Sequence, residues 1–130
     1  MPLARIDLRR GKSAAYKKAI SDGIYQALRE IFTVPENDRF MVVTDRDDED
    51  FIFARNYLGI EHGPDFVILQ ITVSNTRTVE QKQALYARIV ALLAENPGVR
   101  PQDVFINLID VDVANWSFGN GVAQYVAKSP

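Results

Sequence analysis

Stretches of apolar residues predict four strands in this chain. We expect them at residues 2–8, 40–44, 66–73 and 104–111. The third, FVILQITV, is almost continuously apolar, which is typical of a strand in the centre of a sheet. FIFA, residues 51–54, follows the polar DRDDED loop and is predicted as the second arm of a hairpin.

Two long segments between the strands have apolar residues every three or four positions, the spacing of an amphipathic helix. The first helix is predicted from an N-cap at Ser13 to about residue 32. The second is predicted from Thr78 to about Glu95, with Gln81 in its first turn. The apolar face of the first helix consists of Tyr16, Ala19, Ile20, Ile24, Ala27, Leu28 and Ile31.

The two halves of the chain align without a gap after a shift of 65 residues, half of its 130. The identical pairs are Ile6/Ile71, Lys17/Lys82, Ala19/Ala84, Ile24/Ile89, Leu28/Leu93, Glu30/Glu95, Val34/Val99, Asp38/Asp103, Phe40/Phe105 and Asp45/Asp110. They keep step with the same strand–helix–strand order in both halves. We therefore predict a duplicated β-α-β unit, residues 1–65 and 66–130, within a single domain.

Two β-α-β units predict an α+β fold with a four-stranded mixed sheet and both helices on one of its faces. The second face of the sheet then has no helix to cover it. Self-association is the simplest way for a chain of this length to cover that face. A homo-oligomer is therefore expected.

The composition of the chain argues against several classes of partner and of functional site. The formal net charge of −2 argues against nucleic acid or an anionic membrane as a partner. The absence of cysteine excludes disulfides, thiolate metal sites and a cysteine nucleophile. Because neither a signal peptide nor an apolar run of membrane-spanning length is recognisable, we expect a cytoplasmic protein.

Pro2 is the first candidate for chemistry, because it belongs to only one copy of the repeat: Val67 stands at the equivalent position. Removal of Met1 would leave Pro2 with a free secondary amine. An α-amino group titrates far below a lysine, so it can act as a base, as a cationic acid, or as a nucleophile toward a carbonyl. Taken alone, a proline at position 2 is common, and an ordinary strand start explains it better.

Four other residues have both a functional and an ordinary reading. Asp38 can take part in catalysis or shape a turn. Arg77 lies where a strand feeds a helix N-terminus, a place that suits a carboxylate, but it can equally be a solvated turn residue. Trp116 and Phe118 can form an apolar wall over a pocket, or pack in the core or at a subunit interface.

Two further features are expected to be structural. His62 is predicted as a surface loop residue, and DRDDED, residues 45–50, as a solvated turn rather than a calcium loop. The chain has no His/Cys cluster, phosphate-binding glycine loop or serine nucleophile elbow. We therefore predict neither a metal nor a cofactor.

Together, Pro2, the duplicated unit, VPENDRF, SNTRTVEQK and NWSFGNGVAQY resemble the tautomerase superfamily, most closely the malonate semialdehyde decarboxylase group. The resemblance covers almost the whole chain and implies a homotrimer. It implies that Pro2 is the catalytic amine and that Asp38 assists it.

For substrate binding, the resemblance implies a pair of arginines with the spacing Arg-x-Arg. Arg77 stands at the second position, whereas Asn75 replaces the first. The missing charge could come from Arg39, Arg9 or Arg10. Trp116 and Phe118 match the hydrophobic wall of the group.

Three functions follow as hypotheses. The first is cofactor-free decarboxylation of a small 3-oxo acid, with hydration of an acetylenic analogue as a side activity. The second is keto–enol tautomerisation of 2-oxo acids by neutral Pro2. The third is a non-catalytic trimeric binding protein, which retention of Met1 would favour because Pro2 would then have no basic nitrogen.

Overall fold

The computed structural model describes residues 1–126 and contains the predicted four-stranded mixed sheet. Its strands are β1 (Leu3–Arg9), β2 (Met41–Arg46), β5 (Val67–Ser74) and β6 (Val104–Val111), in the order β2-β1-β5-β6. β1 and β2 are parallel, β5 and β6 are parallel, and β1 and β5 are antiparallel. The strongly apolar β5 is thus central, as predicted.

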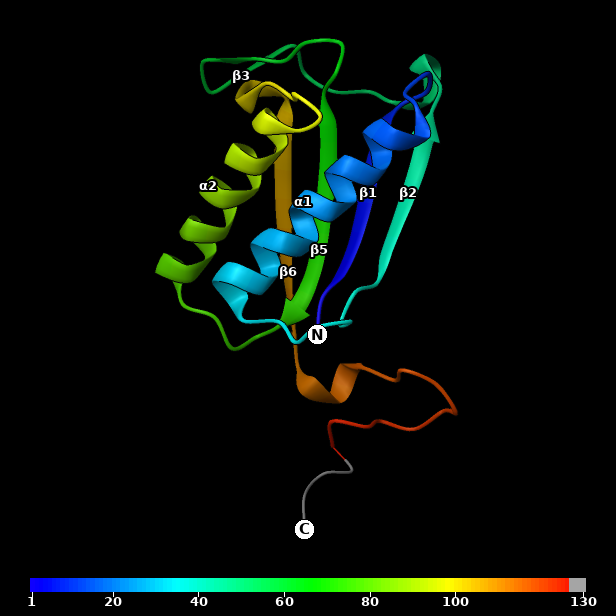
Figure 1. Cartoon of the computed structure of the whole chain (residues 1–130), viewed down its shortest axis with the longest axis vertical. Helices are drawn as coiled ribbons and strands as arrows, with labels where there is room; N and C mark the ends of the chain where they lie inside the picture. The colour runs from blue at the N-terminus through cyan, green and yellow to red at the C-terminus, as the bar shows by residue number, and fades with distance from the viewer. Residues whose placement is uncertain (127–130) are drawn as a thin grey trace.

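Helices α1 (Ala14–Phe32) and α2 (Val79–Glu95) lie together on one face of this sheet (Figure 1). Ser13 caps α1, its hydroxyl accepting a hydrogen bond from the Tyr16 N–H at 3.0 Å. Thr78 and Gln81 form a reciprocal capping box at the start of α2. The predicted helix starts are therefore confirmed.

The core lies between the helices and the sheet. Its residues alternate along the central strands and recur every three or four positions along the helices, which is why each element has one apolar face. The main members are Ala4, Ile6 and Leu8 of β1, Leu69 and Ile71 of β5, Ile20, Ile24 and Leu28 of α1, and Leu85, Ile89 and Leu93 of α2.

The predicted duplication is also visible in the pairing of the elements. Ala4 pairs with Met41 in the first unit, and the equivalent Leu69 pairs with Ile106 in the second. The Lys17 ammonium lies 3.2 Å from the Asp45 carboxylate, and the equivalent Lys82 lies 2.7 Å from Asp110. Each helix is thus tied to its following strand by the same ion pair.

No described residue of a helix covers the second face of the sheet (Figure 1). This face is less apolar than the sequence suggested, because ion-paired Asp7 and Arg46 lie on it among the apolar side chains. Its apolar members are Leu3, Val42, Ile68, Phe105 and Ile109, on the strand positions that alternate with the core.

The hairpin predicted for residues 51–54 is wrong. Asp48–Asp50 form a 3-10 turn, residues 51–54 have no strand partner, and the only hairpin nearby, among residues 1–126, is the short pair β3 (Asn56–Tyr57) and β4 (Ile60–Glu61). The reason is tertiary packing: the Phe53 ring stacks on the buried Phe66 ring at 4.3 Å instead of continuing along β2.

Past β6 the chain forms a 3-10 turn, Val113–Asn115, and a tail that extends beyond the end of the sheet where β1 begins (Figure 1). The last four residues of the predicted second repeat, 127–130, lie outside the described residues. The single domain remains a prediction. Within residues 1–126, no helix has both the length and the apolarity needed to cross a membrane.

Candidate active site

The sheet topology gathers the candidate residues at one of its ends. Because β1 is parallel to β2 and antiparallel to β5, the starts of β1 and β2 meet the ends of β5 and β6. Pro2 precedes β1, Asp38 precedes β2, and Asn75 and Arg77 follow β5. The segment with Trp116 follows β6. Residues far apart in the sequence are therefore neighbours here (Figure 1).

Asp38 has an unsatisfied carboxylate oxygen. Its Oδ1 is fully buried and has no hydrogen-bond partner among residues 1–126. Burial raises the pKa of this carboxyl, and the positive charge of the chain's amino group opposes that rise. A buried, unpaired polar atom costs free energy, so its persistence points to a function.

The amino group that acts on Asp38 is that of Met1. Burial lowers the pKa of this amino group, the negative charge of Asp38 raises it, and the cationic Arg77 lowers it further. Pro2 itself is buried. Removal of Met1 would create a secondary amine on Pro2 in this setting, with a carboxylate and a guanidinium nearby.

Arg77 is held at the C-terminus of α1. Its Nη2 donates to the carbonyl oxygen of Phe32 at 2.9 Å, its Nη1 donates to Thr76 Oγ1 at 3.0 Å, and its guanidinium carbon lies 4.7 Å from the centre of the Phe32 ring. The end of a helix dipole is negative at this place, which stabilises a cation. The remaining guanidinium N–H groups donate to no acceptor among residues 1–126, and the positive charge of Arg77 lowers the pKa of the amino group.

Asn75 joins the ends of two strands. Its backbone N–H donates to the Val111 carbonyl at 2.9 Å, and its side-chain amide donates to Asp112 Oδ1 at 2.7 Å. An arginine at this position would have made the charged clamp that the resemblance implies. The amide nitrogen of Asn75 keeps one further hydrogen for a substrate.

Trp116 and Phe118 form a stacked pair with ring centres 5.6 Å apart. The indole N–H of Trp116 donates to the hydroxyl of Ser74 at 3.3 Å, which ties the tail to the end of β5. The sequence predicted these two rings as a wall but did not identify Ser74 as its anchor.

Tyr125 is a site residue that the sequence reasoning missed. Its ring packs edge-on against Phe118 at 5.0 Å. Burial raises the pKa of its phenol, Asp38 raises it further, and Arg77 opposes the rise, so the phenol lies in the field of the same two groups as the amine. A signal was present, since Tyr125 ends the segment NWSFGNGVAQY that carries the resemblance.

The tail returns to the site through a tight turn. Gly119 and Gly121 have φ angles of 147° and 67°, conformations that favour glycine. Gln124 closes the turn, accepting from the Phe118 N–H at 2.9 Å and donating to the Gly119 carbonyl at 2.9 Å. This turn explains why Tyr125 can contact Phe118.

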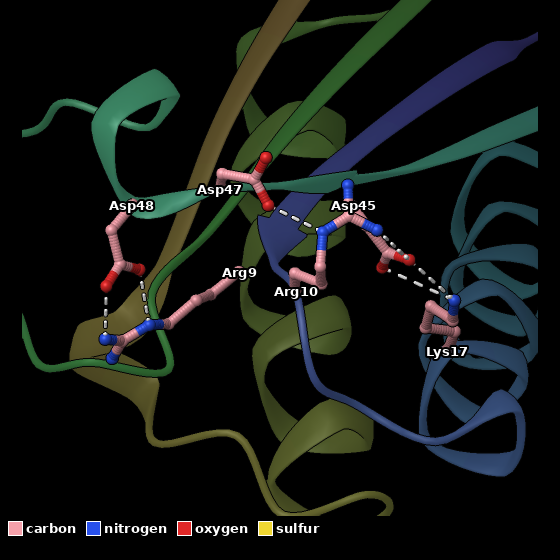
Figure 2. Close-up of polar contacts among 6 residues, drawn as sticks. All are labelled: Arg9, Arg10, Lys17, Asp45, Asp47 and Asp48. Carbon is pink, nitrogen blue, oxygen red and sulfur yellow. Dashed lines mark hydrogen bonds and ion pairs between the residues drawn. The ribbon is translucent and has the colours of Figure 1, made fainter.

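None of the three arginines proposed as substitutes stands free at the site. Arg39 is paired with Asp22 at 2.6 Å. Arg9 and Arg10 follow β1 at the opposite end of the sheet, where Figure 2 shows them bound to Asp48 and Asp47. Arg77 is therefore the cation nearest to the amine that the electrostatics identify.

The same pairs explain the DRDDED segment. The carboxylate of Asp45 binds Lys17, Asp47 binds Arg10 and Asp48 binds Arg9 (Figure 2). Asp45 and Arg46 end β2, and only Asp48–Asp50 form a turn. The prediction of a solvated turn over residues 45–50 is therefore right only in part, because the first two residues belong to a strand and three of the carboxylates are ion-paired. His62 is half-buried, with Nδ1 2.7 Å from the Ala54 carbonyl oxygen, and lies at this far end as well.

The internal repeat provides a control for Asp38. The equivalent Asp103 is only 1% exposed, yet it accepts a hydrogen bond from the Gly63 N–H at 2.6 Å and from Arg100 Nε at 3.0 Å. Burial raises the pKa of Asp103, but these hydrogen bonds outweigh that effect and the pKa is lowered. One copy of the carboxylate is thus fully bound, whereas the copy beside the amine is available.

Comparisons with known proteins identify the family of the chain. Two family models, both described as "Tautomerase enzyme", match residues 38–119 and residues 2–60. The chain is 37% identical over 126 residues to "Probable tautomerase YusQ" of Bacillus subtilis (strain 168), covering 97% of this chain and 99% of that protein.

Solved structures show the same relationship. FG41 malonate semialdehyde decarboxylase inhibited by 3-bromopropiolate is 39% identical, with a TM-score of 0.90 over 96% of this chain and 95% of that one. A second malonate semialdehyde decarboxylase, described with decarboxylase and hydratase activities, is 30% identical, with a TM-score of 0.89 over 96% of both chains.

A symmetric trimer of fused 4-OT shares the fold, with a TM-score of 0.79 at 21% identity over 98% of this chain and 99% of that one. The relative from Bacillus subtilis and the two decarboxylases each match almost the whole chain. The chain belongs to the tautomerase superfamily and is similar within it to the malonate semialdehyde decarboxylases.

Proposed function

We propose that this protein is a cofactor-free enzyme that decarboxylates a small 3-oxo acid, with Pro2 as its amino-terminal amine. The observation that carries the proposal is the buried, unpaired carboxylate oxygen of Asp38 beside the chain's amino group. A carboxylate in that place favours the cationic form of the amine. The similarity of the chain to two malonate semialdehyde decarboxylases supports the same reaction class.

In the proposed reaction, cationic Pro2 donates a hydrogen bond to the 3-oxo oxygen of the substrate. The bond between C1 and C2 breaks and carbon dioxide leaves. The electron pair of that bond forms an enolate whose oxygen faces Pro2. A proton from water is added to C2, which gives the aldehyde or ketone, and Pro2 retains its own proton. Asp38 keeps Pro2 protonated throughout.

Three polar groups hold the substrate carboxylate in this proposal: the guanidinium of Arg77, the amide of Asn75 and the phenol of Tyr125. Asn75 supplies a neutral hydrogen bond in place of a charged one, which costs binding but leaves the carboxylate less stabilised before it departs. Trp116 and Phe118 exclude water, and a desolvated carboxylate loses carbon dioxide more readily.

The proposal extends to a side activity and to assembly. Addition of water to an acetylenic 2-oxo acid uses the same cationic amine, and the second decarboxylase is described with a hydratase activity. We also propose a homotrimer. The uncovered face of the sheet and the trimeric state of a protein with the same fold support it.

Keto–enol tautomerisation of a 2-oxo acid is the second candidate. A specific observation favours it: burial, the largest influence on the amino group, lowers its pKa and so favours a neutral base. The relative from Bacillus subtilis is named a probable tautomerase. In this alternative, neutral Pro2 moves a proton between carbon and oxygen.

The test begins with the intact mass of the purified protein, which we expect to lack Met1. Small 2-oxo and 3-oxo acids are then followed by NMR with the wild-type protein and with Pro2→Ala. We expect 3-oxo acid turnover to fall about 10²–10⁴-fold in the variant, the usual contribution of a positioned acid or base. Unchanged turnover would refute a role for Pro2, and retention of Met1 with no turnover of any oxo acid would indicate a binding protein.

The pH profile separates the two reactions. A cationic amine predicts that kcat/KM falls as pH rises through the pKa of Pro2, whereas a neutral base predicts that it rises through the same pKa. Asn75→Arg adds a second readout, because a restored charged clamp should lower KM for the 3-oxo acid. A control substitution on α1, Lys18→Gln, should leave both profiles as they are.

A further inference from the structure

The internal repeat continues beyond the two β-α-β units into the aromatic wall. The 3-10 turns Asp48–Asp50 and Val113–Asn115 are 65 residues apart. Phe51 and Phe53 are then equivalent to Trp116 and Phe118. The ring centres are 5.4 Å and 5.6 Å apart, so each end of the sheet carries a wall of two rings, although the first pair meets edge-on at 61° and the second is stacked at 22°.

The second wall lines a pocket of about 330 Å³, within the usual range for small-molecule sites. Around it stand Arg9, Asp48, Phe51, Ile52, Phe53, Arg55 and Pro64. This end of the sheet is the one shown in Figure 2, where Arg9 reaches Asp48. The pocket is therefore separate from the site around Pro2.

The charges of the lining favour an anion. The Asp48 carboxylate holds Arg9 through two hydrogen bonds, of 2.7 and 2.8 Å, and the Nη1 N–H groups of Arg9 have no acceptor within residues 1–126. Arg55 forms no ion pair with any of residues 1–126, and its guanidinium carbon lies 5.8 Å from the centre of the Phe53 ring. Two arginines against one aspartate leave a net positive pocket with an aromatic wall.

The groups needed for chemistry are absent or bound at this end. Val67 replaces Pro2, so no amine can form there. Phe66 fills the place where the chain begins in the first unit and is 2% exposed. The carboxylate of Asp103 is bound by Gly63 and Arg100. A ligand in this pocket would meet no free acid or base equivalent to those around Pro2.

We propose that this pocket is a second, non-catalytic site that binds a small organic carboxylate with a flat apolar group. Arg55, with the unused N–H groups of Arg9, binds the carboxylate. Phe51, Ile52 and Phe53 cover the apolar group. Two planar guanidinium groups suit the carboxylate of the ligand. A flat aromatic ring attached to that carboxylate would pack against the phenylalanines.

The probe is benzoate, and benzamide is its neutral control with the same ring. Both are titrated into 15N-labelled wild-type protein while the backbone amide signals of residues 51–55 are followed. We expect benzoate to shift these signals to saturation and benzamide to leave them in place. Absence of benzoate-dependent shifts in this segment, or equal shifts with benzamide, overturns the proposal.

Arg55→Gln removes the free cation, and we expect benzoate binding about tenfold weaker or more, since a charge-assisted hydrogen bond is lost. The matched control is Lys18→Gln, which removes an exposed charge on α1 and should leave binding unchanged. Ile52→Asp, at a position that is 87% exposed, tests the wall without disturbing the core and should also weaken binding. Turnover by Pro2 should be the same in all three variants, so a failure of this proposal can be told from a failure of the proposed function. If Arg55→Gln left benzoate binding intact, the second site would be refuted.

Discussion

Two aspartates, 65 residues apart in a duplicated chain, have opposite surroundings. Asp103 is almost fully buried but accepts hydrogen bonds from a backbone N–H and from Arg100. Asp38 has a buried oxygen without a partner within residues 1–126, and the charge that acts on it is that of the amine. Both positions have the same residue type and the same place in the repeat. The difference between a structural aspartate and one that can interact with the amine therefore comes from the residues around each.

The first prediction compares the same substitution in both copies. Asp103→Ala leaves the Gly63 N–H without its acceptor, so the free energy of unfolding should fall by about 1–3 kcal/mol. Asp38→Ala breaks no side-chain hydrogen bond within residues 1–126 and removes a buried, unpaired oxygen, so the free energy of unfolding should stay level or rise, while turnover falls about 10²-fold. Urea unfolding and the decarboxylation assay measure the two effects; the reverse assignment would contradict our reading of the site.

The pH dependence of stability gives that prediction a control. The pKa of Asp103 is lowered from its ordinary 3.8, so its contribution is present above that value and is lost as pH falls through the folded-state pKa. The pKa of Asp38 is raised, so its ionisation destabilises the fold as pH rises past 3.8. The Asp103→Ala defect should therefore shrink in acid, whereas any gain from Asp38→Ala should appear only above that pH.

At the scale of the elements, the helices could be predicted from the sequence because apolar periodicity and capping residues determine where they lie. Both helices begin after the residues expected, because Ser13 and Thr78 bind N–H groups that a helix start leaves unpaired. Residues 51–54 were misread because F-I-F alternates as in a strand, and only tertiary packing on Phe66 shows that the segment is a wall. The contact of Tyr125 with Phe118 depends in the same way on a glycine turn whose path no periodicity encodes.

The second prediction tests the start of α2, which directly follows Arg77. Thr78→Ala removes the hydroxyl that accepts from the Gln81 N–H, so the free energy of unfolding should fall by about 1 kcal/mol. Thr78→Ser keeps the hydroxyl and should stay close to wild type. Thermal and urea unfolding check both variants; equal stability of the alanine and serine variants would mean that the capping box adds nothing to the fold.

At the scale of the molecule, the antiparallel junction between β1 and β5 explains the whole arrangement. It relates the two units by an approximate two-fold axis, so the strand–helix–strand elements of one unit recur in the opposite direction in the other. Pro2 breaks this equivalence, since only one chain start exists. The duplicated architecture could be predicted from the sequence. The chemical difference between the two ends of the sheet could not, because it depends on contacts of Gly63, Arg100 and Phe66 that only the structure shows.

The last prediction concerns the sheet face that no helix covers. If this face forms the trimer interface, wild-type protein should sediment at three times the 14.7 kDa of the chain. Ile109→Lys places a charge on that face at a position already 36% exposed in the single chain, so it should leave the protomer folded while shifting it to the mass of one chain. Val79→Lys, at an exposed position on α2, should remain a trimer. Sedimentation equilibrium over a range of concentrations measures all three proteins. A wild-type protein that sediments as a single chain would contradict the trimer, and an Ile109→Lys variant that stays trimeric would mean that the subunits meet through another surface.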